Sequence, residues 1–217
     1  MAKTEHYYTP FEEKYFYHIY NRTIDRQPMF KSDDNYWFFL TQFHKYLSPV
    51  LDTYCYCLLT NHFHFLVRIK DDFLLNSDLT AFQKISNLPI TNIENKSIHE
   101  LVSHQFRKFF QSYAMAFNKE QGRVGTLFQT PFKRVLVSSD AYFTQLIYYI
   151  HSNPFHHNLA DDFRNWKWSS YKRILLERPS NLKKEEVINW FGDKNMYLQY
   201  HAELQRVMPE EKFLIED

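Results

Sequence analysis

Glycine is scarce in this sequence, with 3 among 217 residues, so few flexible loops are expected. Apolar residues make up 44% and aromatic residues 19%, which is enough to bury a full core and argues against intrinsic disorder. The sequence contains no signal peptide, no lipidation motif and no apolar run of the roughly 18 residues that a membrane helix needs. We therefore expect a cytoplasmic protein with no membrane contact.

Cysteine is nearly absent, since Cys55 and Cys57 are the two in the chain. They are two residues apart in an alternating stretch, so on a strand their side chains point the same way. Two thiolates without a further cysteine do not complete the ligand set of a structural zinc site. We interpret them as buried thiols of a protein kept in a reducing compartment.

Neither sign of charge dominates, because 26 lysines and arginines against 25 acidic residues give a net charge of +1. This balance argues against a protein that binds polyanions over its whole surface. Basic residues are nevertheless concentrated between Leu101 and Val137, where Glu120 alone is acidic; they are Arg107, Lys108, Lys119, Arg123, Lys133 and Arg134. A local basic surface can attract phosphates. The alternative is an ordinary solvated face.

Hydrophobic periodicity predicts four strands and five main helices. Strands are expected over 16–22, 53–59, 62–69 and 132–137, and helices over 33–47, 97–118, 141–152, 183–191 and 195–207. Ser138, Ser139 and Asp140 are expected to cap the third helix, and Pro154 to end it. The segment 71–96 is interpreted as a surface excursion with a helical turn or two around 79–85.

This order, with hairpins and no regular βαβ units, favours an α+β fold. We predict a ferredoxin-like (RRM-like) antiparallel sheet with helices packed on one face. Residues 1–175 would form this domain, and residues 176–217 would form a C-terminal helical extension.

Two histidines flank Phe63 in an alternating apolar run. On a strand, His62 and His64 share one face and Phe63 lies on the other. If the apolar face packs on the core, the two imidazoles stand above the sheet about 7 Å apart. Such a pair can bind one divalent metal. The alternative is that one or both are hydrogen-bonded surface groups.

The helix expected over 141–152 contains two adjacent tyrosines. At about 100° per residue, Tyr149 and Asn153 lie one turn apart at the edge of the apolar stripe. Tyr148 lies on the opposite flank and is expected to point towards solvent or a partner. Tyr149 is therefore the tyrosine that the histidines of the sheet could reach. A tyrosine can act as a nucleophile when its proton is accepted or a cation stabilises the reacting centre.

The stretch from Asn61 to Val67 resembles the Asn-His-hydrophobic-His signature of single-tyrosine (HUH-superfamily) transposases. Other stretches match in the same order: Tyr17 to Arg22, Phe117 to Lys119, Gly125 to Gln129, Phe132 to Arg134, Tyr149 to Pro154 and Trp168 to Tyr171. Together they span about residues 15–172. On these motifs the chain is similar to the REP-associated tyrosine transposases, of the insertion-sequence-200 type.

The resemblance implies a ferredoxin-like nuclease that recognises single-stranded DNA folded into hairpins. Tyr149 would cut a phosphodiester and leave a 5′-phosphotyrosine and a free 3′-hydroxyl. His62 and His64 would hold Mg²⁺ or Mn²⁺, with Asn153 as the third ligand. The resemblance also implies DNA contacts from Asn21, Arg22, Arg123, Lys133 and Arg134. A homodimer is left open, and with it whether the tyrosine serves the metal site of its own chain.

Two departures from the family pattern lie close to these motifs. Thr60 stands where the family usually has proline, and the three residues 155–157 replace the commoner Val-Arg-Ala. Two other functions also stay open. One is a module that binds single-stranded nucleic acid without cutting it. The other is a zinc hydrolase, for which the histidines lack a nearby acidic residue at ligand spacing.

Overall fold

The computed structural model describes residues 8–71, 79–137 and 140–207. Its strands are β1 (Phe16–Arg22), β2 (Leu51–Leu58), β3 (His62–Ile69) and β4 (Lys133–Val137). The helices of the first two thirds are α2 (Asp33–Leu47), α4 (Leu79–Ser86), α5 (Ile90–Glu94) and α6 (Ile98–Gln121). They are followed by α7 (Asp140–His156), the 3₁₀ turn η1 (Phe163–Asn165), α8 (Tyr171–Leu175), α9 (Lys184–Phe191) and α10 (Lys194–Val207).

The four strands form one antiparallel sheet in the order β2-β3-β1-β4. β2 and β3 are a hairpin, closed by a hydrogen bond from the Leu59 N–H to the His62 carbonyl at 2.9 Å. Helix α2 joins β1 to β2, and α6 lies in the connection from β3 to β4. This topology is ferredoxin-like, so the predicted fold class is confirmed.

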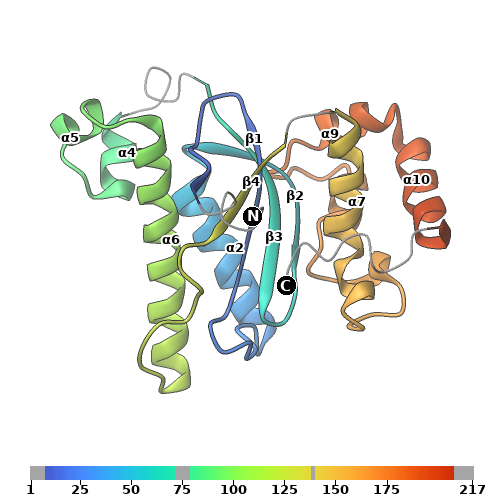
Figure 1. Ribbon diagram of the computed structural model, residues 1–217, viewed down its shortest axis with the longest axis horizontal. Helices are drawn as coiled ribbons and strands as arrows, with labels where there is room; N and C mark the ends of the chain where they lie inside the picture. Colours follow the sequence, from blue (N-terminus) through green and yellow to red (C-terminus); the bar gives the residue numbers. More distant parts are fainter. Residues whose placement is uncertain (1–7, 72–78, 138–139, 208–217) are drawn as a thin grey trace.

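One face of the sheet packs on α2 and α6 (Figure 1). This first core is aromatic: the rings of Phe43 on α2 and Phe65 on β3 stack with their centroids 3.9 Å apart. Ser97 and Glu100 form the predicted capping box at the start of α6. The caps proposed at 138 and 139 lie outside the described residues.

The opposite face of the sheet is buried as well, which corrects the prediction that helices cover one face. Helix α7 packs across β2 and β3 on this side, beside α9 and α10 (Figure 1). Its apolar stripe forms a second core with Cys55, Cys57 and Leu66, and both thiols are buried and free, as predicted. His62 and His64 belong to this face and are 4% and 0% exposed, so the prediction that they stand clear of the core is wrong.

Helix α7 differs from its prediction in two further ways. It continues to His156, with Pro154 inside it, so the prediction that Pro154 ends the helix is wrong. A proline this close to the C-terminal end removes one backbone donor without breaking the preceding turns. Tyr148 is 1% exposed and packs against the rings of Phe163 and His201. Its predicted exposure is also wrong, because elements that follow α7 cover that flank.

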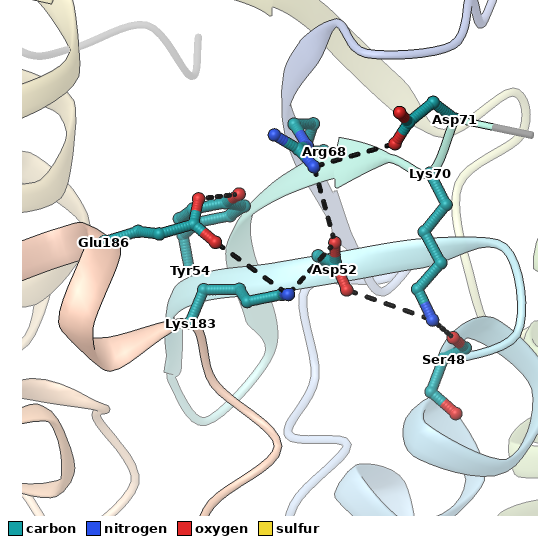
Figure 2. Close-up of polar contacts among 8 residues, drawn as sticks. All are labelled: Ser48, Asp52, Tyr54, Arg68, Lys70, Asp71, Lys183 and Glu186. Atoms are coloured by element: carbon teal, nitrogen blue, oxygen red, sulfur yellow. Dashed lines mark hydrogen bonds and ion pairs between the residues drawn. The ribbon is translucent and has the colours of Figure 1, made fainter.

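The C-terminal helices are attached to the free edge of the sheet. Leu182 forms a parallel bridge with Thr53 of β2, and the Lys183 N–H donates to the Thr53 carbonyl at 2.9 Å. Close by, the hydroxyl of Tyr54 donates to Glu186 of α9 at 2.7 Å (Figure 2). These contacts occupy part of the β2 edge, which would otherwise present unpaired backbone groups to solvent.

Ion pairs strengthen the same attachment. The carboxylate of Asp52 lies 3.6 Å from the ammonium of Lys183 and 3.9 Å from the side chains of both Arg68 and Lys70 (Figure 2). The Asp52 side chain is 14% exposed, so solvent screens these pairs less than it screens pairs on an open surface. One carboxylate thus joins β2, β3 and the segment that leads into α9.

A buried chain of hydrogen bonds joins α10 to α7 and to β2. The Tyr56 N–H donates to the Ser170 hydroxyl at 2.9 Å, and that hydroxyl lies 2.9 Å from Nε2 of His151. Nδ1 of His151 lies 3.1 Å from Nε2 of His201, whose Nδ1 lies 2.8 Å from the Tyr197 carbonyl. All four ring nitrogens therefore have partners. The Ser170 hydroxyl also donates to the Tyr56 carbonyl at 3.1 Å, and the Tyr197 hydroxyl lies 3.3 Å from Nδ1 of His151. Burial favours the neutral rings, since it lowers the pKa of His151 well below its ordinary value and the pKa of His201 to about 4.

We predict that mild acid destabilises the fold through His201. Its pKa falls from 6.5 to about 4 on burial, so the unfolded state binds the proton first as the pH drops. The free energy of unfolding should therefore decrease between pH 6.5 and pH 4, and this site contributes about 3 kcal/mol of that loss. Urea denaturation across this window measures it. His201→Phe should flatten the dependence and His44→Phe, at an exposed position on α2, should not. An unchanged slope in His201→Phe would contradict the prediction.

Candidate functional site

The register of the sheet places basic residues beside the two histidines. Arg22 on β1 pairs with His62, and Tyr20 pairs with His64. Tyr20 pairs in turn with Lys133 on β4, so these side chains share one face of the sheet. A small depression beside His62 is lined by Tyr20, Asn21, Arg22, Gln129 and Lys133. The structure therefore gathers most of the predicted site residues in one place.

Helix α7 brings Tyr149 onto the histidines. Its ring meets that of His64 edge-on, with centroids 5.6 Å apart, and that of His18 at 5.9 Å. His18 was not singled out from the sequence, yet its Nε2 lies 2.9 Å from Nδ1 of His64. The available signal was its position two residues before Tyr20 in the alternating stretch of β1, which places both on the same face.

Hydrogen bonds determine which histidine nitrogens can bind a metal. Asn61 donates from Nδ2 to the Arg26 carbonyl at 2.7 Å, which turns its Oδ1 to Nδ1 of His62 at 2.6 Å. An amide oxygen only accepts, so Nδ1 of His62 carries the hydrogen and Nε2 carries the lone pair. When His64 donates from Nδ1 to His18, its Nε2 carries a lone pair as well. Histidines that bind metals are held in this way, with the second nitrogen donating to an outer partner.

Asn153 supplies an oxygen donor near the same helix turn. Its Nδ2 donates to the Tyr149 carbonyl at 2.8 Å, which leaves Oδ1 as the acceptor end of a buried amide. Among the described residues, no three or more His, Cys, Asp or Glu side chains are grouped to hold a metal ion. Two imidazoles and one amide oxygen are donor types that would suit a divalent ion whose other positions take water or substrate.

A further histidine, which sequence analysis noted only as a departure from the family pattern, lies at the end of α7. The ring of His157 is 4.6 Å from that of His62, in an edge-to-face arrangement. The His157 N–H donates to the carbonyl of Asn153 at 3.0 Å, which holds this turn against the helix. His157 therefore lies against one side of His62.

The two adjacent basic residues of β4 point to opposite faces. The ammonium of Lys133 lies 5.3 Å from the centre of the Tyr20 ring, on the face of the histidines. Arg134 is 7% exposed on the other face, donates from Nε to the Thr9 carbonyl, and packs over the ring of Phe11. The expectation that Lys133 and Arg134 act on one surface is corrected, because neighbouring strand residues alternate.

The other three predicted DNA contacts have different surroundings. Arg22 lines the depression, and its Nε has no hydrogen-bond partner within the part of the chain that is described. Asn21 accepts from the Arg22 N–H through Oδ1 and donates to a carbonyl in the loop before β4, so it shapes the strand end. Arg123 lies beyond the end of α6, 3.2 Å from the carboxylate of Asp25.

The structure also separates the two tyrosines of α7. Burial raises the pKa of Tyr148, which makes the loss of its proton harder. The Tyr148 ring faces η1 and α10, whereas that of Tyr149 faces His18 and His64. Tyr149 is therefore the tyrosine whose ring faces the histidines.

Comparisons with known proteins add information on the fold. No family model matches this chain, and no curated protein matches it. A solved structure of a REP-associated tyrosine transposase bound to a REP hairpin is similar, with a TM-score of 0.53 and 13% sequence identity. The match covers 78% of this chain and 85% of that one, and it shows a shared fold. No helix among the described residues is long and apolar enough to cross a membrane.

We predict that His62 and His64 bind Mn²⁺. His62→Leu and His64→Leu keep much of the buried volume but remove the lone pairs, so measurable binding should be lost. His18→Phe removes the outer partner of His64 and should weaken binding about 10–100-fold. An electron paramagnetic resonance titration measures the affinity, with circular dichroism to check folding and His44→Leu as the exposed control. Wild-type affinity in both leucine variants at positions 62 and 64 would refute the assignment.

Proposed function

We propose that this chain is a metal-dependent endonuclease and strand transferase for single-stranded DNA, a tyrosine transposase that acts at hairpins. The observation that carries the proposal is the contact of the Tyr149 ring with His64, on the face that also presents Arg22 and Lys133. Two further facts support it. The sequence motifs occur in the family's order, and the fold is shared with a transposase solved with a hairpin. On this proposal the chain is a member of the REP-associated group.

Tyr149 is the nucleophile in this mechanism. Its phenolic oxygen attacks the phosphorus, the bond from phosphorus to the 3′ oxygen breaks, and a 5′-phosphotyrosine forms. The phenolic proton passes to solvent, and the departing 3′ oxygen takes up a proton. Attack of a second 3′-hydroxyl on the phosphotyrosine reverses these steps and joins the strands. A divalent ion held by His62, His64 and Asn153 would polarise a phosphate oxygen and stabilise the leaving group.

Arg22 and Lys133 bind the DNA backbone beside the reacting phosphate. Both are basic residues and line the depression that contains His62. Contacts of this kind set the position and register of a strand and carry no sequence information of their own. Arg134, on the opposite face of the sheet, is not part of this surface.

A second candidate is a module that binds hairpin DNA without cutting it. The observation that favours it is that the described residues include no cluster of three His, Cys, Asp or Glu ligands. Such a module would keep the basic surface and the fold. It would form no covalent bond to DNA, and this separates it from the enzyme.

We predict that Tyr149→Phe abolishes the covalent adduct with a hairpin oligonucleotide in Mg²⁺ or Mn²⁺. The substitution removes the attacking oxygen and keeps the ring on His64, so hairpin affinity should stay within about twofold. A denaturing gel with 5′-labelled and 3′-labelled DNA measures the adduct. Tyr148→Phe is the matched control and should still form it. An adduct that persists in Tyr149→Phe, or a phosphopeptide that maps to Tyr148, would refute the assignment. A wild-type protein that binds hairpins and forms no adduct would support the binding module.

We predict that Lys133→Ala weakens binding similarly for all DNA sequences. Loss of one phosphate contact should reduce the slope of log affinity against log salt by about 1. Fluorescence anisotropy at several salt concentrations measures both quantities. Arg134→Gln removes the neighbouring charge from the other face and should leave the slope unchanged. A changed sequence preference with an unaltered slope in Lys133→Ala would instead indicate base reading.

A further inference from the structure

The proposed chemistry depends on where α7 holds Tyr149, and α7 is held from behind by the C-terminal helices. His151 lies on α7 between Tyr149 and Asn153, and its ring meets α10 through His201. We propose that His201 is a positioning residue for Tyr149 and acts through His151. This inference rests on the proposed function and gives the C-terminal extension a role in it.

The geometry of α7 separates the reacting side from the held side. Residues two apart on a helix point about 200° apart, so His151 lies on the far side of α7 from Tyr149. Tyr149 meets His18 and His64 of the sheet, whereas His151 meets Ser170 and His201. Hydrogen bonds therefore hold one side of α7, while the other side carries the proposed nucleophile.

The contact that holds α7 combines directional hydrogen bonds with apolar packing. Both imidazoles are 0% exposed, and each ring nitrogen has a partner at 2.8–3.1 Å, with the Tyr197 hydroxyl as a further neighbour of His151 Nδ1 at 3.3 Å. Ser170 links this chain of hydrogen bonds to the backbone of β2. If His201 is lost, Nδ1 of His151 keeps only the longer contact to the Tyr197 hydroxyl, at 3.3 Å, so α7 is held less firmly.

His201, at the far end of these hydrogen bonds from α7, is itself held in place by its neighbours. The His201 ring lies among aromatic rings of α8, α9 and α10, with centroids 5.0 Å from Tyr171, 5.7 Å from Phe191 and 4.3 Å from Tyr197. The segment before α9 is attached to the sheet edge through Lys183 and Asp52 (Figure 2). The C-terminal extension thus contacts both α7 and the sheet that carries the histidines, and it helps to set the position of one relative to the other. A nucleophile displaced by about 1 Å can lose about 100-fold in rate.

The test uses the full chain and separates positioning from packing. His201→Phe keeps an aromatic ring and removes both nitrogens, while His201→Gln restores a donor and an acceptor. Gln199→Ala, at an exposed position on α10, is the control. Three quantities are measured: the single-turnover rate of adduct formation at saturating hairpin DNA, hairpin affinity, and the ¹⁹F resonance of 3-fluorotyrosine placed at 149.

We expect adduct formation by His201→Phe to be about 10–100-fold slower, with hairpin affinity within twofold and a shifted or broadened ¹⁹F resonance. His201→Gln should recover most of the rate, and Gln199→Ala should match the wild type. A folded His201→Phe with the wild-type rate and resonance would overturn the proposal, since the network would then serve packing alone. If His201→Phe does not fold, Ser170→Ala removes the hydrogen bond to His151 at the other end of the network. The same outcomes then support or overturn the proposal.

The ¹⁹F measurement needs no DNA, so it distinguishes the two proposals. If the wild-type protein forms no adduct, the proposed function fails and the resonance alone decides the role of His201. A shifted resonance in His201→Phe then supports positioning, and an unchanged one overturns it.

Discussion

The packing of α7 on the second face of the sheet is the constraint on which the site depends. It places Tyr149 against His64 and removes the histidines of β1 and β3 from solvent. A buried imidazole needs hydrogen-bond partners, since polar groups that lose water without compensation are costly. Asn61 and His18 supply those partners, and by doing so they turn the lone pairs of His62 and His64 away from them. The hydrogen bonds that compensate for the burial of His62 and His64 are therefore the same ones that orient their lone pairs.

Charged side chains gather in two different places on this sheet. Asp52 is surrounded by cations and fastens the C-terminal segment to the edge of β2. Lys133 and Arg22 line the depression beside His62, and the proposed phosphate contacts would come from them. The side chains of the proposed site come from three strands and one helix and not from loops, and rigid elements hold a site more accurately than loops do.

Much of the fold could be predicted because its signals are local. The alternating runs of β1 and β3, the hairpin around Thr60 and Asn61, and the capping box of Ser97 and Glu100 each involve neighbours in the chain. Alternation also showed that His62 and His64 share a face, and helical spacing showed that Tyr149 and Asn153 lie one turn apart. These relations follow from backbone geometry, so they hold whatever packs against the element.

What covers each face was decided by the tertiary structure alone. The sequence did not reveal that α7 and the C-terminal helices bury the second face of the sheet, and so the exposure expected for His62, His64 and Tyr148 was wrong. Arg134 was grouped with Lys133 until the sheet showed which side each one meets. His18 and His201 gain their partners from residues 46 and 50 positions away. Periodicity determines which side chains share a face, whereas contacts between distant segments determine what that face meets.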